Sequence, residues 1–324
     1  MHDLDENYQL NEMNLKDKVF LLMFLKNYCI KYRDSLGLNL DMTFGIEIEC
    51  RVSADDTYIA RQNIPFTMVP EGSAGPNGWE FVSPIFHDNM DTWQEVKKTC
   101  TDLKDFATTN NFCGGHIHYG AHVFEDNYKY LLNFIFIWMA YEDIIYRFGN
   151  GEMLNTRRSA DSYAIPVINR FKDLFFSQDM PKNLRKFLRN FKTGSLELGL
   201  NFYHYYAYYN HEMDTKNTVE IRCPNGSLEE TIWQNNVNCF GKIIQRSLSD
   251  DLDLTRLYYN IDSLACQDSE ILARYSKINL DKALEFADLI FDNNLDKLNF
   301  LKQYIKDGKE ADGNVLVKSK RFWK

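Results

Sequence analysis

The chain has 324 residues, of which 44% are hydrophobic and 26% are charged, so a folded globular protein is expected rather than a disordered one. Its formal net charge of −9 argues against nucleic acid as a partner, because phosphate backbones favour basic surfaces. Its seven cysteines form no CxxC pair, and no signal peptide or apolar span of bilayer length is evident, so we expect a cytoplasmic protein without membrane contact.

The first half of the chain alternates between helical and strand-like patterns. Apolar residues at helical spacing predict a helix over about residues 12–35 that ends near Gly37. Three β-type segments follow, namely TFGIEIECRV, WEFVSPIF and HIHYGAHVF, and the glycine- and proline-rich VPEGSAGPNGW separates the first two. Residues 89–110 and 125–148 again have helical periodicity.

The second half is less regular at first and then mostly helical. Residues 150–193 have a mixed pattern with several arginines, and the aromatic run FYHYYAYY precedes a further strand candidate, TVEIRCP. From Ser227 onward the helical period dominates. A helix, a strand-rich middle and a helical end predict the α+β fold class.

Four of the short strands share one design, in which apolar residues alternate with acid, imidazole or guanidinium. In GIEIE, Glu47 and Glu49 stand two positions apart, so on a strand both carboxylates face the same way, about 6–7 Å apart. Each segment alone is also typical of a solvated strand face. Paired in one sheet, the strands would gather seven polar side chains on one face: Glu47, Glu49, Glu80, His116, His118, Glu220 and Arg222.

Such a face holds too many like charges to be stable alone. Neighbouring carboxylates raise each other's pKa unless cations intervene. Carboxylates with one imidazole suit Mg²⁺ or Mn²⁺ better than structural zinc, which prefers thiolates and more histidines. Several carboxylates can hold two metals about 4 Å apart, which suits phosphoryl chemistry. Arg222 then fits as a bidentate clamp for a phosphate or a carboxylate.

Three glycines surround the two histidines in CGGHIHYG. Gly114, Gly115 and Gly120 remove side chains beside the imidazoles, which would let a ligand or a neighbouring backbone approach. They could equally do no more than shape turns at the two strand ends.

The motifs FGIEIE, EGS with GWEFVSP, CGGHIHYG, and YYN with TVEIRCPNGSLEETIW occur in one order. As an ordered set they resemble the amidoligase family of the carboxylate–amine ligase superfamily, to which glutamine synthetase and glutamate–cysteine ligase also belong. The resemblance implies a curved, largely antiparallel sheet of the glutamine-synthetase catalytic type with helices packed on its convex face. It covers about residues 42–245, so we expect a helical extension over 1–41, a ligase-like catalytic domain over 42–245, and a helical region over 246–324 packed on the same domain.

The resemblance also implies an ATP- and Mg²⁺-dependent ligase, with Mn²⁺ as the alternative metal, that forms an amide or isopeptide bond through an acyl phosphate. Its substrates would be a carboxylate and an amine from an amino acid, a peptide or a protein side chain. Homo-oligomers are common among such enzymes. The implied metal ligands are Glu49 and Glu80 near the carboxylate substrate, and Glu47, His116 and Glu220 near the ATP phosphates.

Further roles follow from the same motif match. His118 and Asn210 would contact the nucleotide or the substrate, and Arg222 would steady the phosphoryl group in transit. Glu71 of EGS would bind a metal or the amine, whose proton it could take. In LNTRRSADSYAIP, Arg157 or Arg158 is a candidate phosphate or carboxylate ligand, although a surface arginine pair fits equally well. Residues 150–200 match the family only in fragments, so the reaction type is better defined than the substrate.

Three other functions stay open on the sequence. A metal-dependent amide hydrolase could use the HxH pair with His204, His211 or Asp214, but these lie in no strand-end pattern and the alternation of a barrel is missing. A guanidino phosphotransferase would release ADP with a guanidine acceptor and no carboxylate. A non-catalytic relative would bind ATP and Mg²⁺ without turnover, yet it would have little reason to keep so much mutual repulsion.

Overall fold

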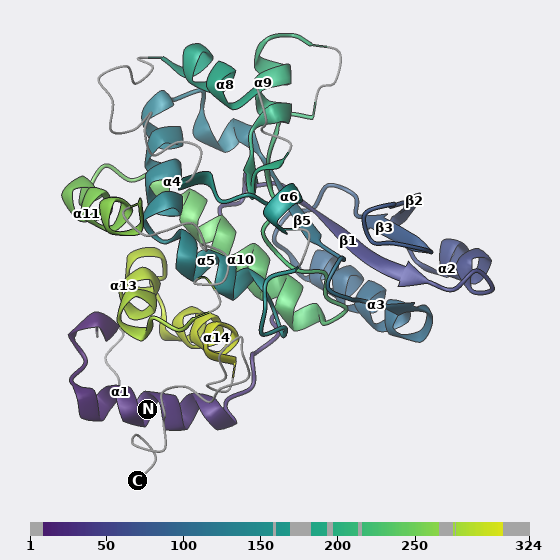
Figure 1. Ribbon diagram of the computed structural model, residues 1–324, viewed down its shortest axis with the longest axis horizontal. Helices are drawn as coiled ribbons and strands as arrows, with labels where there is room; N and C mark the ends of the chain where they lie inside the picture. The colour runs from purple at the N-terminus through teal and green to yellow at the C-terminus, as the bar shows by residue number, and fades with distance from the viewer. Residues whose placement is uncertain are drawn as a thin grey trace.

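The computed structural model describes residues 9–157, 160–168, 183–192, 197–212, 216–265, 275 and 277–306. Helices and one sheet share this part of the chain (Figure 1). The strands are β1 Phe44–Val52, β2 Thr67–Pro70, β3 Gly78–Val82, β4 Ala107–Thr108, β5 Gly115–Gly120, β6 Leu200–Asn201 and β7 Thr218–Ile221. The helices of the first half are η1 Leu10–Glu12, α1 Leu15–Asn27, α2 Thr57–Asn63, α3 Met90–Phe106, η2 Ala121–Phe124, α4 Tyr128–Ala140 and α5 Glu142–Gly149. Those of the second half are α6 Ala160–Tyr163, α8 Leu184–Lys192, α9 Tyr203–Tyr209, α10 Glu230–Ser247, α11 Leu254–Ala265, α13 Leu280–Ile290 and α14 Asn294–Ile305.

The sheet is open and antiparallel, with seven strands. Six of them follow the order β2-β3-β1-β5-β7-β6, and β4 pairs with the end of β1. The nine-residue β1 lies at the centre, between β3 and β5, so it has neighbours on both sides along most of its length. The α+β prediction is confirmed to this extent, while the glutamine-synthetase type of the fold stays a prediction.

One face of the sheet is apolar and lies on α3 and α10. Its isoleucines, Ile46, Ile48 and Ile117, are fully buried. Phe44 stacks on Trp93 of α3 with ring centroids 5.5 Å apart, and the Tyr119 hydroxyl donates to the Val237 carbonyl of α10 over 2.7 Å. Burying each such aliphatic side chain stabilises the fold by about 1.5–3 kcal/mol. This face therefore supports the strands whose opposite face is polar.

Helix α10 is the central helix of the molecule. It contacts α3 next to the sheet and also α4, α13 and α14, which lie farther from it (Figure 1). Most of its 18 residues are buried, as expected for a helix with neighbours on several sides. None of the described helices is long and apolar enough to cross a membrane.

Several predicted boundaries are wrong. The helix expected over 12–35 ends at Asn27, because Tyr28 turns to an extended conformation and the following segment finds hydrogen-bond partners on other helices. The strand expected to continue to Phe124 stops at Gly120, where η2 begins. The helix expected over 125–148 is divided at Tyr141 into α4 and α5.

A buried polar network joins the segment after α1 to α10 and α14. Arg33 forms an ion pair with Asp296, whose side chain is fully buried, and Asn238 donates to the same carboxylate over 2.7 Å. The Arg33 backbone N–H donates to the Gln234 side chain over 2.8 Å, and that side chain donates back to the Arg33 carbonyl. The residues before β1 and the helix α14 are thus tied to α10 by hydrogen bonds.

Replacing Asp296 with alanine should lower the free energy of unfolding by about 3 kcal/mol, because it leaves the partly buried Arg33 and the buried Asn238 without their shared partner. Urea unfolding measures this difference. Asp281 is the matched control, since its carboxylate pairs with Lys18 over 2.8 Å but is 79% exposed. Asp281→Ala should change the stability by less than about 1 kcal/mol. Equal effects of the two substitutions would contradict a structural role for the network.

Candidate metal centre

The strand register brings the predicted polar residues together. Glu47 lies directly opposite His116 on β5, and Glu49 lies directly opposite Glu80 on β3. On the next pair of strands, His118 lies opposite Glu220 of β7. Directly opposed residues of an antiparallel pair have Cβ atoms about 4.5–5.5 Å apart, so the side chains meet on the polar face. The expectation that the GIEIE acids and the CGGHIHYG imidazoles share one place is confirmed.

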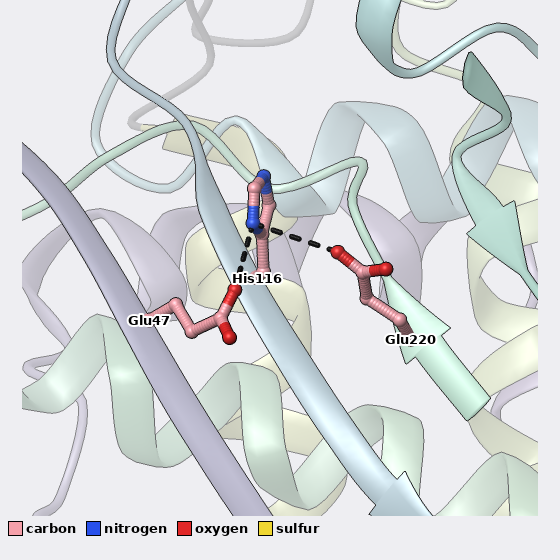
Figure 2. Close-up of side chains that lie close together, drawn as sticks. All are labelled: Glu47, His116 and Glu220. Carbon is pink, nitrogen blue, oxygen red and sulfur yellow. Dashed lines mark hydrogen bonds and ion pairs between the residues drawn. The ribbon is translucent and has the colours of Figure 1, made fainter. Parts of the chain in front are cut away.

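His116 lies at the centre of this cluster. Figure 2 shows its imidazole on β5 between Glu47 of β1 and Glu220 of β7. Its Nδ1 lies 3.0 Å from Glu47 Oε2, 3.5 Å from Glu80 Oε1 and 3.6 Å from Glu220 Oε1. Its Nε2 lies 3.3 Å from Glu49 Oε1 but makes no hydrogen bond in the described structure. One buried imidazole therefore faces four carboxylates.

Two sets of three side chains have the spacing that a metal ion requires. Glu47, His116 and Glu220 form one set, and Glu49, Glu80 and His116 form the other. Within each set the candidate ligand atoms lie within 4.8 Å of one another. Carboxylate oxygens with one imidazole fit Mg²⁺ or Mn²⁺. The first set contains the three ligands that the motif resemblance implies near the ATP phosphates, and the second set adds His116 to the implied pair of Glu49 and Glu80.

The carboxylates of the cluster differ in how their charge is compensated. Burial and the charges of Glu47, Glu49, Glu71 and Glu220 raise the pKa of Glu80 to about 8. Burial acts to raise the pKa of Glu47 too, but hydrogen bonds and attraction from the two imidazoles outweigh it and hold that pKa well below its ordinary value. A divalent cation between the carboxylates would remove the cause of the repulsion.

Arg222 is the one arginine among the seven polar residues that the sequence predicted on this face of the sheet. Its Nη1 donates to Glu220 Oε1 over 2.6 Å, and its Nε donates to the Tyr163 carbonyl over 3.1 Å. Burial acts to raise the pKa of Glu220, but the charge of Arg222 and both imidazoles hold it below its ordinary value. Asn201 of β6 donates to the other oxygen of Glu220 over 2.7 Å. Glu220 is therefore held ionised and in one orientation.

The space that the two glycines before His116 leave free is occupied by other side chains rather than by a ligand. A Cβ on Gly114 would collide with the guanidinium of Arg157, and a Cβ on Gly115 would collide with the Trp233 ring of α10. Residues two apart share a face, so Arg157 lies on the polar side with His116, and Trp233 lies on the apolar side. Gly114 thus makes room for the guanidinium of Arg157 on the polar face, and Gly115 makes room for α10 on the apolar face.

Arg157 is almost completely buried beside the cluster. Its guanidinium donates to the Pro224 carbonyl, and its Nε has no hydrogen-bond partner in the described structure. Burial lowers its pKa, and the negative charge of Glu49 opposes that shift. None of the described carboxylates forms an ion pair with it. A buried cation in this state favours an anion next to Glu49. Its neighbour Arg158 lies outside the described residues.

The other predicted site residues are distributed around this centre. Glu71 lies close enough to affect Glu80, and its Oε1 accepts the Ser73 N–H over 2.7 Å. The amide oxygen of Asn210 accepts from Arg185 over 3.2 Å, and its nitrogen donates to the Tyr206 carbonyl. These contacts of Asn210 do not include the acid cluster.

The histidines considered for a hydrolase are separated. The His204 ring of α9 lies 5.8 Å from the His118 ring, measured between centroids, whereas His211 is exposed after the end of the same helix. Asp214 lies outside the described residues. Asn201 adjoins the site without having been predicted there, and His204, which was considered only for a hydrolase, lies next to His118. Asn201 sits on a two-residue strand that leaves no periodic signal, and His204 is hidden within the aromatic run.

A seven-stranded antiparallel sheet with acids and imidazoles on one face defines an α+β protein with candidate ligands for divalent metals. The comparison with known families specifies it further. A family model described as "Putative amidoligase enzyme" matches residues 49–243, which is more than half of the chain. The chain therefore belongs to the amidoligase family, and the family indicates a ligase. No curated protein shows significant similarity to the chain.

The shifted pKa of Glu80 predicts a pH dependence of the metal-free protein. The pKa is about 8 in the folded state and near 4.5 for an unperturbed glutamate. The folded state keeps a proton that the unfolded state releases, so stability falls as the pH rises from 4.5 through 8. Glu80→Gln cannot release this proton.

In EDTA, the stability of Glu80→Gln relative to the natural chain should therefore be greater at pH 8.5 than at pH 5.5, by more than about 1 kcal/mol. Denaturant unfolding at both pH values measures it. The same relative stability at the two pH values would show that the carboxyl of Glu80 does not have a raised pKa.

Proposed function

We propose that the chain is an ATP-dependent carboxylate–amine ligase that forms an amide or isopeptide bond through an acyl phosphate. The observation that carries this proposal is the pair of metal-ligand sets that share His116 on the polar face of the sheet. Side chains that can hold two metal ions next to each other suit the transfer of a phosphoryl group. Membership of the amidoligase family supports the same class of reaction.

Each ligand set takes one part of the reaction in this proposal. Glu49 and Glu80 hold the metal nearer the carboxylate substrate. Glu47, His116 and Glu220 hold the metal nearer the ATP phosphates. Mg²⁺ or Mn²⁺, when bound, supplies the positive charge that phosphoryl transfer requires.

The residues of the chain position the reactants for two steps. In the first step, a carboxylate oxygen attacks the γ-phosphorus, the bond from this phosphorus to ADP breaks, and an acyl phosphate forms. Glu220 orients Arg222 so that its guanidinium can neutralise charge on the phosphoryl oxygens. Arg157, buried beside Glu49 without a carboxylate partner among the described residues, provides a cation for the substrate carboxylate.

In the second step, an amine attacks the acyl carbon and the bond from this carbon to the phosphate oxygen breaks. The attacking nitrogen must lose a proton. Glu71 is the proposed acceptor, because its carboxylate is close enough for its charge to raise the pKa of Glu80. The leaving group is inorganic phosphate, so the products are an amide, ADP and phosphate.

The proposed partners are small molecules or polypeptides rather than nucleic acid. An amino acid, a peptide or a protein side chain can supply the carboxylate and the amine. The six described cysteines are all free thiols, which is compatible with the proposed cytoplasmic location. A homo-oligomer is also part of the proposal.

Replacing Glu49 with glutamine should lower the rate of ADP formation about 100-fold, because it removes one carboxylate from the cluster and leaves its shape intact. The assay measures ADP release from ATP and Mg²⁺ with mixtures of carboxylates and amines. ADP release should require both a carboxylate and an amine. Glu229→Gln is the matched control, since Glu229 is half exposed and pairs with Lys104 at the surface. Full turnover by Glu49→Gln would refute the assignment.

Scrambling of oxygen between the bridging and terminal positions of the ATP phosphates isolates the first step. Reversible formation of an acyl phosphate predicts scrambling with the carboxylate alone. ADP formation that needs only a guanidine would favour a phosphotransferase instead. Amide hydrolysis without nucleotide would favour a hydrolase.

A further inference from the structure

Glu142 is a fully buried glutamate at the start of α5, and it belongs to neither of the metal-ligand sets. Its Oε1 accepts hydrogen bonds from Trp138 Nε1 over 3.0 Å and from the Val167 backbone N–H over 2.6 Å. Its Oε2 accepts from the Ile168 backbone N–H over 3.0 Å and from the Tyr275 hydroxyl over 3.3 Å. One buried carboxylate thus binds four donors, and two of them are successive backbone N–H groups.

The burial of this carboxylate opposes folding. None of the described lysines and arginines forms an ion pair with it. Burial raises the pKa of Glu142 to about 7, although the hydrogen bonds from Ile168, Val167, Trp138 and Tyr275 act against that rise. An ionised group in the protein interior without a cation costs free energy, which hydrogen bonds offset only in part. Packing alone therefore does not account for a glutamate at this position.

The segment 163–168, which Glu142 binds, is also held by Tyr146, one turn farther along α5. The Tyr146 hydroxyl donates to the Ala164 carbonyl over 2.6 Å. The same hydroxyl lies beside Gly199, where a Cβ would collide with its oxygen. Helix α5 therefore contacts both this segment and the residue that precedes β6.

The segment 163–168 and Gly199 are joined to each other and to Arg222. The Gly199 N–H donates to the Ile165 carbonyl over 2.9 Å, and the Gly199 carbonyl accepts the Arg222 backbone N–H over 2.8 Å. The Nε of Arg222 donates to the Tyr163 carbonyl over 3.1 Å. The main chain and the side chain of Arg222 are thus both bound by residues that α5 contacts.

We infer that Glu142 is a positioning residue, which acts through the segment 163–168 to fix the guanidinium of Arg222. This inference rests on the proposed function, since it takes Arg222 as the group that neutralises charge on the phosphoryl oxygens. With Nε bound to Tyr163 and Nη1 bound to Glu220, the planar guanidinium is fixed at two points. Its Nη2 makes no hydrogen bond within the described residues and is left for the phosphoryl group.

Crystal structures of the natural chain and of Glu142→Gln, grown at pH 8.5, test the position of Arg222 without any substrate. At this pH the carboxyl of Glu142 is ionised. Glutamine places an amide nitrogen where an oxygen accepts a backbone N–H, so the segment 163–168 should move away. The guanidinium should then shift by about 1 Å or more, and its Nε should lose the Tyr163 carbonyl.

The rate of ADP release tests whether Glu142 acts through Arg222. Glu142→Gln should lower this rate about tenfold. Arg222→Lys keeps a positive charge but has no Nε that can donate to Tyr163. In that background Glu142→Gln should lower the remaining rate by less than about twofold, because two changes to one interaction are not additive. An equal loss in both backgrounds would overturn the inference, since Glu142 would then act without Arg222.

Asp296→Asn is the matched control for a loss of stability. Asp296 is also a buried carboxylate, but its partners are Arg33 and Asn238. This substitution should lower the free energy of unfolding and leave the rate of ADP release unchanged. A fall in ADP release equal to that of Glu142→Gln would assign both effects to stability and would overturn the inference.

Tyr146→Phe gives a second test if Glu142→Gln fails to fold. It removes only the hydroxyl that donates to Ala164, so Arg222 should shift and the rate of ADP release should fall about threefold. An unchanged position of Arg222 in every variant that folds would overturn the inference, whatever the activity. A natural chain that releases no ADP would overturn the proposed function alone, because the crystal structures would still decide whether Glu142 holds Arg222.

Discussion

The register between β1 and its two neighbours is the constraint on which the candidate site depends. It sets Glu47 opposite His116 and Glu49 opposite Glu80, so four carboxylates and two imidazoles meet above one sheet. A shift of one residue on β1 would turn the acids into the apolar layer and the isoleucines into the site. The packing of Ile46 and Ile48 against the core therefore fixes the position of the charged side chains. Gathering these like charges lowers the stability of the fold, and the burial of the apolar face of the sheet offsets that loss.

The CGGHIHYG segment connects the two sides of this arrangement. Its histidines project into the cluster, while Gly115 lets Trp233 of α10 pack against the sheet and Gly114 makes room for Arg157. The helix α10 and Arg157 thus meet the chain at Gly114 and Gly115. These two glycines allow the residues around the site to pack closely, and they do not open a path for a ligand.

The sequence predicted the side-chain content of the site because alternation on a strand is a local property. Glu47 and Glu49 share a face whatever the rest of the chain does. The end of α1 at Asn27 could not be predicted in this way, because Gln234 and Asn299 bind the following segment from helices more than 200 residues away. Asn201 escaped notice for a similar reason, because a two-residue strand has no period.

The most direct measurement is a crystal structure of the protein with Mn²⁺ and ADP, recorded with anomalous scattering from manganese. The account predicts one manganese among Glu47, His116 and Glu220 and a second beside Glu49 and Glu80. Manganese bound at neither set of ligands, in crystals that contain ADP, would contradict it.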